Sequence, residues 1–319
     1  MNLLKLRLSI IGTVAFIIGL STLAFTILLT LTGTFNLYSI IIFVVLINLL
    51  QWIFSPRLID SLYKAKEVTP NEQPKLHRMV DSICRKSSLK KPKIMLANIP
   101  LPNAFAYGSP RYGNRIAVTT GLLNSLESEE VEAVLAHEVG HLKNKDVQVM
   151  MFASVLPAIF YYIGFTFMLS SFYSGGRRDN GGTIIIGIAA MVLYWILSIF
   201  VLNLSRTREY YADRHAVNTV DDGARKLSEA LAKIATSETK TMRKGRSSGS
   251  SSFKSLFIND PDTAKSDAST LSKYSGHLND RDLVNKILTK PITGFDRFLE
   301  LFSTHPNMVK RLKALQRIG

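Results

Sequence analysis

Cysteine is nearly absent from this chain of 319 residues, which contains a single one, Cys84. One cysteine excludes an intramolecular disulfide framework and thiolate-rich zinc or iron–sulfur sites, so any metal must be bound by histidine and carboxylate side chains. Cys84 could itself be a thiol nucleophile. Its neighbours Ile83 and Arg85 form no known catalytic motif, however, and a structural role is the simpler interpretation.

Acidic residues are also scarce, because 24 Asp and Glu stand against 39 Lys and Arg and leave a formal net charge of +15. Such a charge could indicate binding to nucleic acid. The basic residues are spread along the chain, however, no nucleic-acid module is visible, and cytoplasmic loops of membrane proteins are basic anyway. The hydrophobic content of 47% and the mean hydropathy of +0.15 favour a membrane protein without a nucleic-acid partner.

Charged residues are missing altogether from Leu8–Leu31 and Leu37–Phe54, and two further apolar stretches follow at about Val147–Phe172 and Thr183–Asn203. Each is long enough to cross a hydrocarbon core of about 30 Å at about 1.5 Å per residue. The first stretch resembles a signal peptide, but it lacks a clear cleavage site and a second span follows at once, so we interpret it as a retained anchor. The sequence therefore predicts four transmembrane helices.

The basic residues that flank these stretches indicate the orientation. On one side lie Lys5, Arg7, Arg57, Lys64, Lys66, Lys143, Lys145, Arg206, Arg208 and Arg214. The other side carries Arg177 and Arg178. Because cytoplasmic loops carry the excess of Lys and Arg, we expect a multi-pass protein of the cell membrane with both termini and the polar chain in the cytoplasm.

The spans divide the chain into four parts. We expect transmembrane hairpins at 1–56 and 147–203, and cytoplasmic segments at 57–146 and 204–319. Within the last segment, 236–270 is rich in Ser, Gly and Lys and has little apolar periodicity, which predicts a mobile loop. That loop could touch lipid headgroups or gate a cleft, although a solvated linker is the simpler interpretation.

The first cytoplasmic segment has recognisable elements. Helical spacing of apolar residues predicts a helix over Asn71–Ser87, and Pro92–Ala97 is typical of a strand. Asn103–Tyr107 and Arg115–Thr120 are expected to pair around a Gly- and Pro-containing turn, and Ser128 to cap the following helix. The strand pair could add an extended peptide at its edge, or it could simply close a small core.

The helix that follows contains the pentapeptide His137-Glu138-Val139-Gly140-His141. Histidines four residues apart share one helix face, so both imidazoles can reach one zinc ion while Glu138 takes a proton from metal-bound water. This HExxH pattern is a metalloprotease signature, but it is short, and such residues can also lie on an ordinary surface.

A third ligand is available beyond the fourth span, where Glu209 and Asp213 lie four residues apart. Glu209 would complete a His₂Glu zinc set, and Asp213 could accept a hydrogen bond from the second nitrogen of a zinc-bound histidine. These acids could instead pair with neighbouring arginines. We favour the metal site, because the second membrane hairpin brings His141 and Glu209 to the same side of the bilayer, each about six residues from its span.

Several motifs in order resemble the HtpX family of membrane zinc endopeptidases over nearly the whole chain. They are Asn103-Ala-Phe-Ala106, Gly121-Leu-Leu, HEVGH followed by Asp146, Arg208-Glu-Tyr-Tyr-Ala-Asp213 and Ser303-Thr-His-Pro306. The resemblance implies a mainly α fold with a small β-sheet, a gluzincin-like cytoplasmic protease domain and one Zn²⁺ per subunit. It also implies His137, His141 and Glu209 as ligands, Glu138 as catalytic base, and a role in quality control of membrane proteins.

Three further residues are assigned by the same resemblance. His305 and Arg311 match a tail motif that in related membrane zincins helps to bind the substrate carbonyl and to steady the zinc carboxylate. His305 could alternatively belong to the start of a final helix. Asn103 resembles a substrate-positioning residue of the family's edge strand.

The expected activity is hydrolysis of peptide bonds in membrane-protein or unfolded polypeptide substrates. Two alternatives remain. A CAAX prenyl endopeptidase shares the zinc chemistry but normally has more spans, and a non-catalytic scaffold would normally fill all four zinc positions with protein ligands. The oligomeric state and the physiological substrates do not follow from the sequence.

Overall fold

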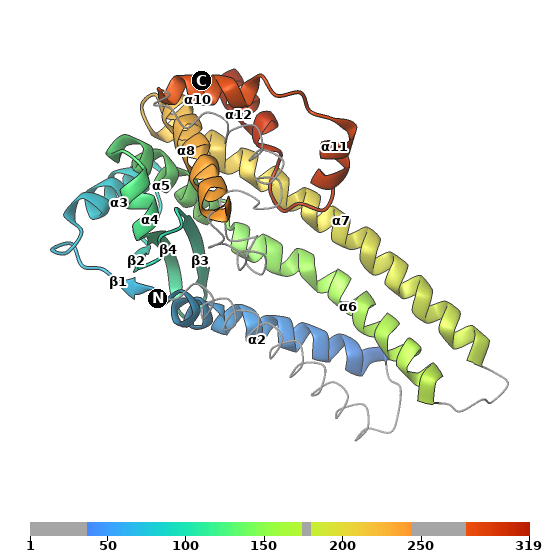
Figure 1. Ribbon diagram of the computed structural model, residues 1–319. Helices are drawn as coiled ribbons and strands as arrows, with labels where there is room; N and C mark the ends of the chain where they lie inside the picture. The colour runs from blue at the N-terminus through green and yellow to red at the C-terminus, as the bar shows by residue number, and fades with distance from the viewer. Residues whose placement is uncertain (1–36, 174–179, 244–278) are drawn as a thin grey trace.

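A computed structural model describes residues 37–173, 180–243 and 279–319 of the chain. Helices make up most of this part, and one small sheet lies among the shorter ones. Three long helices project together from this group, as Figure 1 shows. The predicted class, mainly α with a small β-sheet, is confirmed.

The long helices are α2 (Leu37–Tyr63), α6 (Asp146–Tyr173) and α7 (Asn180–Thr219). All three are long and apolar enough to cross a membrane. Large apolar side chains along them are exposed, for example Ile185 at 68%, which fits contact with lipid. The first predicted span, Leu8–Leu31, lies outside the described residues, so the count of four remains a prediction.

Two glycines allow α6 and α7 to pack closely along their length. A Cβ added at Gly164 would lie 2.8 Å from the Cγ of Met191, and one at Gly187 would lie 3.3 Å from the Gly164 carbonyl oxygen. Helices in lipid associate largely through such close backbone approach, because the surrounding acyl chains are as apolar as their side chains. The two helices therefore form a closely packed hairpin.

Helix α7 continues well beyond the predicted end of its span at Asn203 and ends at Thr219. Residues 204–219 contain no glycine or proline to interrupt the backbone hydrogen bonds. The segment that carries Glu209 and Asp213 is consequently part of the same rod as the membrane span.

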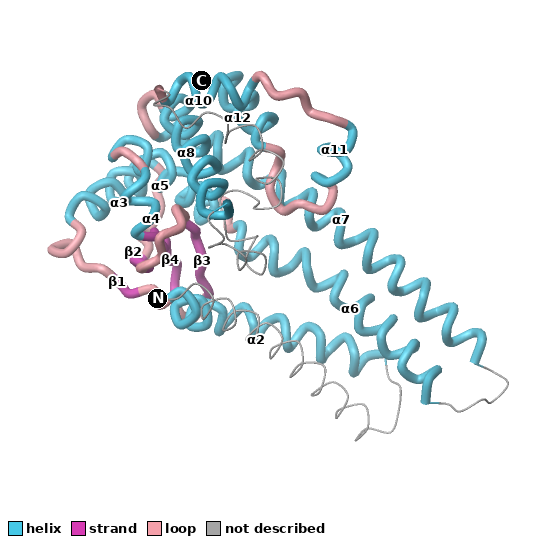
Figure 2. The backbone as a smooth tube through the Cα atoms, in the orientation of Figure 1, coloured by secondary structure: helices cyan, strands magenta, loops and turns pink. Residues whose placement is uncertain are grey.

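The sheet has the strand order β1 (Lys66–Glu67), β2 (Lys93–Ala97), β4 (Gly113–Thr119), β3 (Ala104–Ser109). Strand β2 is parallel to β4, and β3 is antiparallel to β4, as the predicted strand pair requires. Strand β3 forms one edge of the sheet and packs against α5 and α2. Figure 2 shows the four strands lying beside the bases of the long helices.

Shorter helices cover the sheet and form the main apolar core. The N-terminal group consists of α3 (Pro74–Lys86), α4 (Thr120–Ser125) and α5 (Ser128–Lys143). The predicted helix over Asn71–Ser87 corresponds to α3, with Leu76, Val80 and Ile83 buried as its spacing requires. Helix α8 (Gly223–Arg243) packs on α5.

The described C-terminal residues, 279–319, contain three helices. They are α10 (Asp280–Leu288), α11 (Gly294–Glu300) and α12 (Met308–Ile318). Helix α12 packs on α7 and α8 and buries Leu312 and Leu315, whereas α11 lies apart from the main core beside α7 (Figure 1).

Two boundary predictions are wrong. Ser128 is the first residue of α5, and its N-cap is Glu127, whose side chain forms a reciprocal capping box with Glu130. A carboxylate at this position satisfies the same free N–H groups as a serine hydroxyl and also suits the positive end of the helix dipole.

The expected mobile loop 236–270 begins too early, because α8 continues through Thr236 to Arg243. The Thr236 hydroxyl donates a hydrogen bond to the Ala232 carbonyl oxygen at 2.8 Å, so this polar side chain is satisfied within the helix. Residues 244–270 lie outside the described part.

Candidate metal centre

Helix α5 carries His137, Glu138 and His141 at the interface with α7, where His137 and Glu138 are almost fully buried. Gly140 makes this interface possible, because a Cβ there would lie 3.1 Å from the Cα of Ala212 on α7. The glycine at the fourth position of the pentapeptide thus lets the two helix backbones approach closely. Both histidines then face α7.

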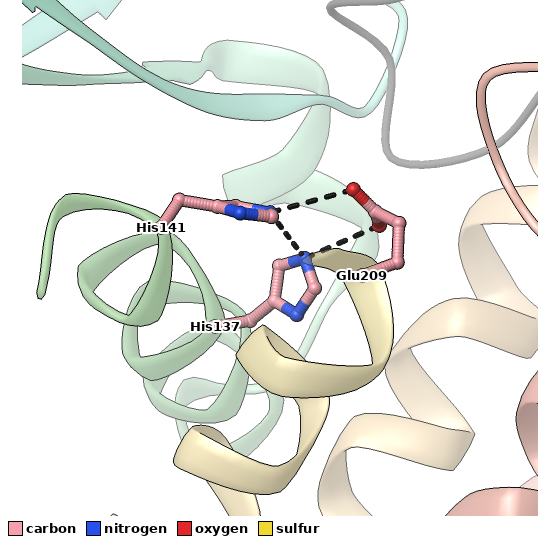
Figure 3. A group of neighbouring side chains, drawn as sticks. All are labelled: His137, His141 and Glu209. Carbon is pink, nitrogen blue, oxygen red and sulfur yellow. Dashed lines mark hydrogen bonds and ion pairs between the residues drawn. The ribbon is translucent and has the colours of Figure 1, made fainter. Parts of the chain in front are cut away.

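Glu209 reaches the two histidines from α7, as Figure 3 shows. The His137 and His141 Nε2 atoms are 3.1 Å apart, and the Glu209 carboxylate oxygens lie 3.6 and 3.5 Å from them. Ligands that surround one ion tetrahedrally at about 2.0–2.2 Å are separated by about 3.3–3.6 Å. The three side chains therefore fit a single zinc-sized ion, and the structure brings together the residues that the sequence proposed as a set.

Buried charges around the ligands favour a cation. Burial alone would lower the pKa of His137, but hydrogen bonds to Asp213 and Glu209 outweigh it and raise that pKa to about 9. The second oxygen of Glu209, Oε2, is buried and forms no regular hydrogen bond, although Arg311 Nη1 lies 3.2 Å from it, and a metal ion would give it a further partner.

Asp213 and Arg311 contact the proposed ligands His137 and Glu209 on the side away from the cavity. Asp213 Oδ1 lies 2.9 Å from His137 Nδ1, so the histidine can donate this hydrogen and keep Nε2 free to bind metal. Arg311 is only 1% exposed and contacts Asp213 through Nε and Nη2 at 2.7 and 2.6 Å. Its Nη1 lies 3.2 Å from Glu209. Arg311 therefore ties two buried carboxylates together.

The sequence reasoning missed the partner of His141. Asp146, the first residue of α6, lies with Oδ2 2.6 Å from His141 Nδ1. Lys145 makes this possible, because its left-handed backbone (φ 55°) turns the chain sharply between α5 and α6. The five-residue spacing does not fit one helix face, so only a predicted helix break after Lys143 could have revealed the contact.

Glu138 faces a cavity of about 310 Å³ that the ligands, β3 and the first turns of α6 line. Burial is the main cause that raises the pKa of this carboxyl, and the neighbouring His141 and His137 partly oppose it. Its carboxylate also accepts a hydrogen bond from the backbone N–H of Ala106 in β3. The edge strand therefore turns a main-chain donor towards the reactive side chains.

His305 lies at the same cavity, 6% exposed, with Nε2 3.7 Å from Glu209 Oε1. Its Nδ1 is 3.0 Å from the Thr304 hydroxyl. Helix α12 begins only at Met308 with Asn307 as its cap, so the capping alternative for His305 is not observed.

Asn103 is placed differently. It is 1% exposed and precedes β3, where its backbone pairs with Thr119 of β4. The neighbouring residues Ala104–Tyr107 line the cavity, and Asn103 is not among its lining residues. A direct contact between this side chain and substrate stays a prediction.

A second acidic group in the described residues consists of Glu130, Glu229 and Asp280. Lys233 already occupies its centre, with Nζ 2.7 Å from Glu130 and 2.9 Å from Asp280. The ammonium supplies the positive charge that these carboxylates require, so the group is an internal ion pair network.

Comparison with known proteins agrees with this geometry. A model of peptidase family M48 matches residues 70–318. A protein named Protease HtpX homolog from Aeropyrum pernix is 35% identical over 319 residues, which cover 98% of this chain and 96% of that protein. The homolog of the same name from Thermoplasma acidophilum is 33% identical over 316 residues, covering 97% of this chain and 91% of that one.

One solved structure shares the fold. The crystal structure of S. mikatae Ste24p aligns with a TM-score of 0.59 over 98% of this chain and 67% of that chain. The sequence identity is 19%, so this likeness concerns the fold alone.

Proposed function

The chain belongs to peptidase family M48 and is a membrane metalloendopeptidase, and we propose that its metal is one zinc ion per subunit, held by His137, His141 and Glu209. The observation that carries the proposal is the convergence of these side chains, whose ligand atoms all lie within 4.8 Å of one another. Histidine and carboxylate donors without thiolates suit zinc in a catalytic site.

Glu138 is the proposed catalytic base. Zinc bound at this site would polarise the substrate carbonyl and make water more acidic. Glu138 takes a proton from the attacking water and delivers it to the leaving nitrogen, so that its carboxylate is regenerated. The raised pKa of this buried carboxyl suits both roles, because a group that takes and returns a proton works best when its pKa is close to the ambient pH.

The substrate is proposed to bind as an extended strand along β3. This strand is an edge of the sheet, and it borders the cavity through Ala104–Tyr107. The Ala106 N–H already points to Glu138, which places a main-chain donor next to the position of the scissile bond. Asn103, at the start of the strand, would help to position the bound peptide.

His305 and Arg311 are proposed to assist from the other wall. His305 Nε2 lies 3.7 Å from Glu209 Oε1, so its imidazole is beside the metal site, where it is proposed to donate a hydrogen bond to the substrate oxygen on which negative charge develops. Arg311 and Asp213 hold Glu209 and His137 in place. A purely structural zinc site would need a fourth protein ligand, and the group found in the described residues has three.

The proposed location is the cell membrane, with the site and both termini on the cytoplasmic side. The basic residues flanking the spans support this orientation. Since Glu209 lies in the same helix as a span, the site is close to the bilayer surface. Exposed segments of damaged or misfolded membrane proteins, or of unfolded polypeptides, are the substrates that such a position favours.

Replacing Glu138 with Gln tests the mechanism. We expect Glu138→Gln to bind zinc as the wild type does and to lose cleavage of an unfolded model substrate such as casein. Glu132→Gln is the matched control, because it makes the same change on α5 at a residue that does not line the cavity. Cleavage at the wild-type rate by purified Glu138→Gln would refute the assignment.

A second experiment addresses the substrates. Membranes that contain the wild type and membranes that contain Glu138→Gln are compared by quantitative proteomics. The inactive enzyme is then isolated, and the proteins bound to it are identified. Damaged membrane proteins should accumulate in the membranes that contain the inactive form, and they should be isolated together with it. If soluble native proteins accumulated instead, the quality-control role would be wrong while the peptidase assignment stood.

A further inference from the structure

Helix α11 has its aromatic face turned outwards. Phe295, Phe298 and Leu299 of α11 lie at the spacing i, i+3, i+4, which places them on one side of the helix. Phe302, at i+7, follows in the turn just after the helix end at Glu300, where its N–H bonds to the Leu299 carbonyl oxygen at 3.0 Å. Their exposed fractions are 67%, 56%, 38% and 49%. The rings of Phe298 and Phe302 pack edge to face with centroids 5.4 Å apart, so these two side chains form one apolar surface.

The opposite side of the helix is tied to the protein by polar contacts. Glu300 is 9% exposed, accepts a hydrogen bond from the Asn307 N–H at 3.1 Å and pairs with Lys310. In a water-soluble domain, an amphipathic helix buries its apolar side and exposes its polar side. Helix α11 does the reverse, and a rotation that buried the aromatic patch against the protein would break the Glu300 contacts.

Contacts with α7 place α11 next to the lipid-facing part of the protein. Arg206 of α7 donates hydrogen bonds to the carbonyl oxygens of Glu300 and Ser303 at 2.6 and 2.8 Å. Phe200, 66% exposed on the apolar part of the same helix, lies six residues or about 9 Å along the axis from Arg206. Figure 1 shows α11 beside α7, displaced from α12 towards the far end of the long helices.

We propose that α11 is an in-plane membrane anchor whose patch, Phe295, Phe298, Leu299 and Phe302, inserts into the headgroup and acyl boundary of the bilayer that α7 spans. Helices that lie in this boundary bury Phe and Leu side chains to about 5–10 Å and keep charged groups outward. Arg297, exposed on the opposite face of α11, is suited to contact headgroups. A short helix suffices because α7 already holds it at the membrane, so docking is intramolecular.

The anchor would also position the mouth of the candidate site. The chain leads from α11 through Ser303 directly to His305, which lines the cavity. Ser303 donates a hydrogen bond to the His305 carbonyl oxygen at 2.8 Å and its own carbonyl is held by Arg206. Insertion of α11 into the bilayer surface would therefore fix the distance between the lipid and His305, which forms part of the cavity wall.

Spin labels at single introduced cysteines test the proposal without using catalysis or metal. Phe298→Cys and Arg297→Cys are prepared in the full chain and reconstituted in vesicles of three parts phosphatidylcholine to one part phosphatidylglycerol. Cys84 can stay, because it is 3% exposed and burial, with a smaller contribution from Asp81, raises the pKa of its thiol to about 11. The labelled wild type gives the blank.

Oxygen concentrates in lipid and a nickel chelate stays in water, so the ratio of their collision rates with the label reports its surroundings. We expect this ratio to be at least about threefold higher at Phe298→Cys than at Arg297→Cys, because only the first label enters the acyl region. Ile185→Cys on α7 and Gln316→Cys on α12 are the lipid and water references.

Two results would overturn the proposal. Equal ratios at Phe298→Cys and Arg297→Cys, both at the level of Gln316→Cys, would show that the patch faces water. A label at Phe298→Cys that meets neither reagent would show that protein covers the patch, either another part of this chain or a second copy. Phe302→Cys, on the same face, repeats the test with a second variant.

Discussion

Asp146→Asn is the change that examines the metal site most directly. Asp146 Oδ2 lies 2.6 Å from His141 Nδ1, and a carboxylate can only accept this hydrogen bond. The hydrogen of this bond is therefore on His141 Nδ1, which leaves Nε2, 3.1 Å from His137 Nε2, as the nitrogen that faces the metal site. An asparagine amide that donates through its NH₂ group would favour the opposite tautomer, with a proton on the nitrogen that should bind zinc.

The magnitude follows from the role of such supporting contacts. Loss of the group that orients a metal-binding histidine typically lowers metal affinity about 10–100-fold. At about 1.4 kcal/mol per factor of ten, this corresponds to about 1.4–2.8 kcal/mol of zinc-binding free energy. Arg208 Nη1 is 3.8 Å from the same Asp146 oxygen, so part of the loss would come from this pair.

The assay is a zinc titration of the purified, metal-free protein against a chromophoric chelator, followed by cleavage of an unfolded substrate at each zinc concentration. We expect weaker binding by Asp146→Asn and recovery of much of the cleavage at excess zinc. Asp81→Asn is the matched control, because Asp81 pairs with Lys91 at the surface away from the site. Zinc affinity of a folded Asp146→Asn within twofold of the wild type would refute the reasoning.

Three further outcomes are expected. Arg311→Leu should destabilise the metal-free protein by about 3–5 kcal/mol in chemical unfolding, since it leaves two buried carboxylates without their cation; a loss below about 1 kcal/mol would contradict this. Cys84 should react with a thiol reagent at pH 8 only after unfolding, because the pKa of its thiol is raised to about 11; rapid labelling of the folded chain would contradict its burial. Gly164→Leu should destabilise the hairpin by about 1–3 kcal/mol, because the added side chain collides with Met191, whereas Gly182→Leu, with open space around it, should not; equal unfolding of the two variants in denaturing detergent would show that the helices are not closely packed there.

Local elements of the fold could be predicted because their signals are local. Long uncharged runs mark α2, α6 and α7, and the spacing of Leu76, Val80 and Ile83 marks α3. The strand order could not be predicted in the same way. The parallel pairing of β2 with β4 joins segments separated by β3. The residue pattern within one strand does not show which distant strand it pairs with.

The site was predictable to the extent that the membrane constrains it. Glu209 could be assigned because a hairpin of two spans returns the chain to the side of His141. Asp146 could not, because its contact depends on the unusual backbone of Lys145, a residue type that gives no sign of a positive φ. The aromatic spacing in α11 is equally ambiguous, since a sequence cannot tell whether such a face meets a protein core or lipid.

The continuity of α7 joins these observations. One uninterrupted helix contains the apolar span, the Arg206 side chain that holds α11, Glu209 at the metal centre and the segment packed against Gly140. A helix is stiff over this length, so the depth of the span in the bilayer fixes the height of the metal ligand above it. An in-plane anchor on the same helix would add a second point of attachment and restrict rotation about the helix axis. The peptidase would then meet its substrates at a constant distance and orientation from the membrane surface.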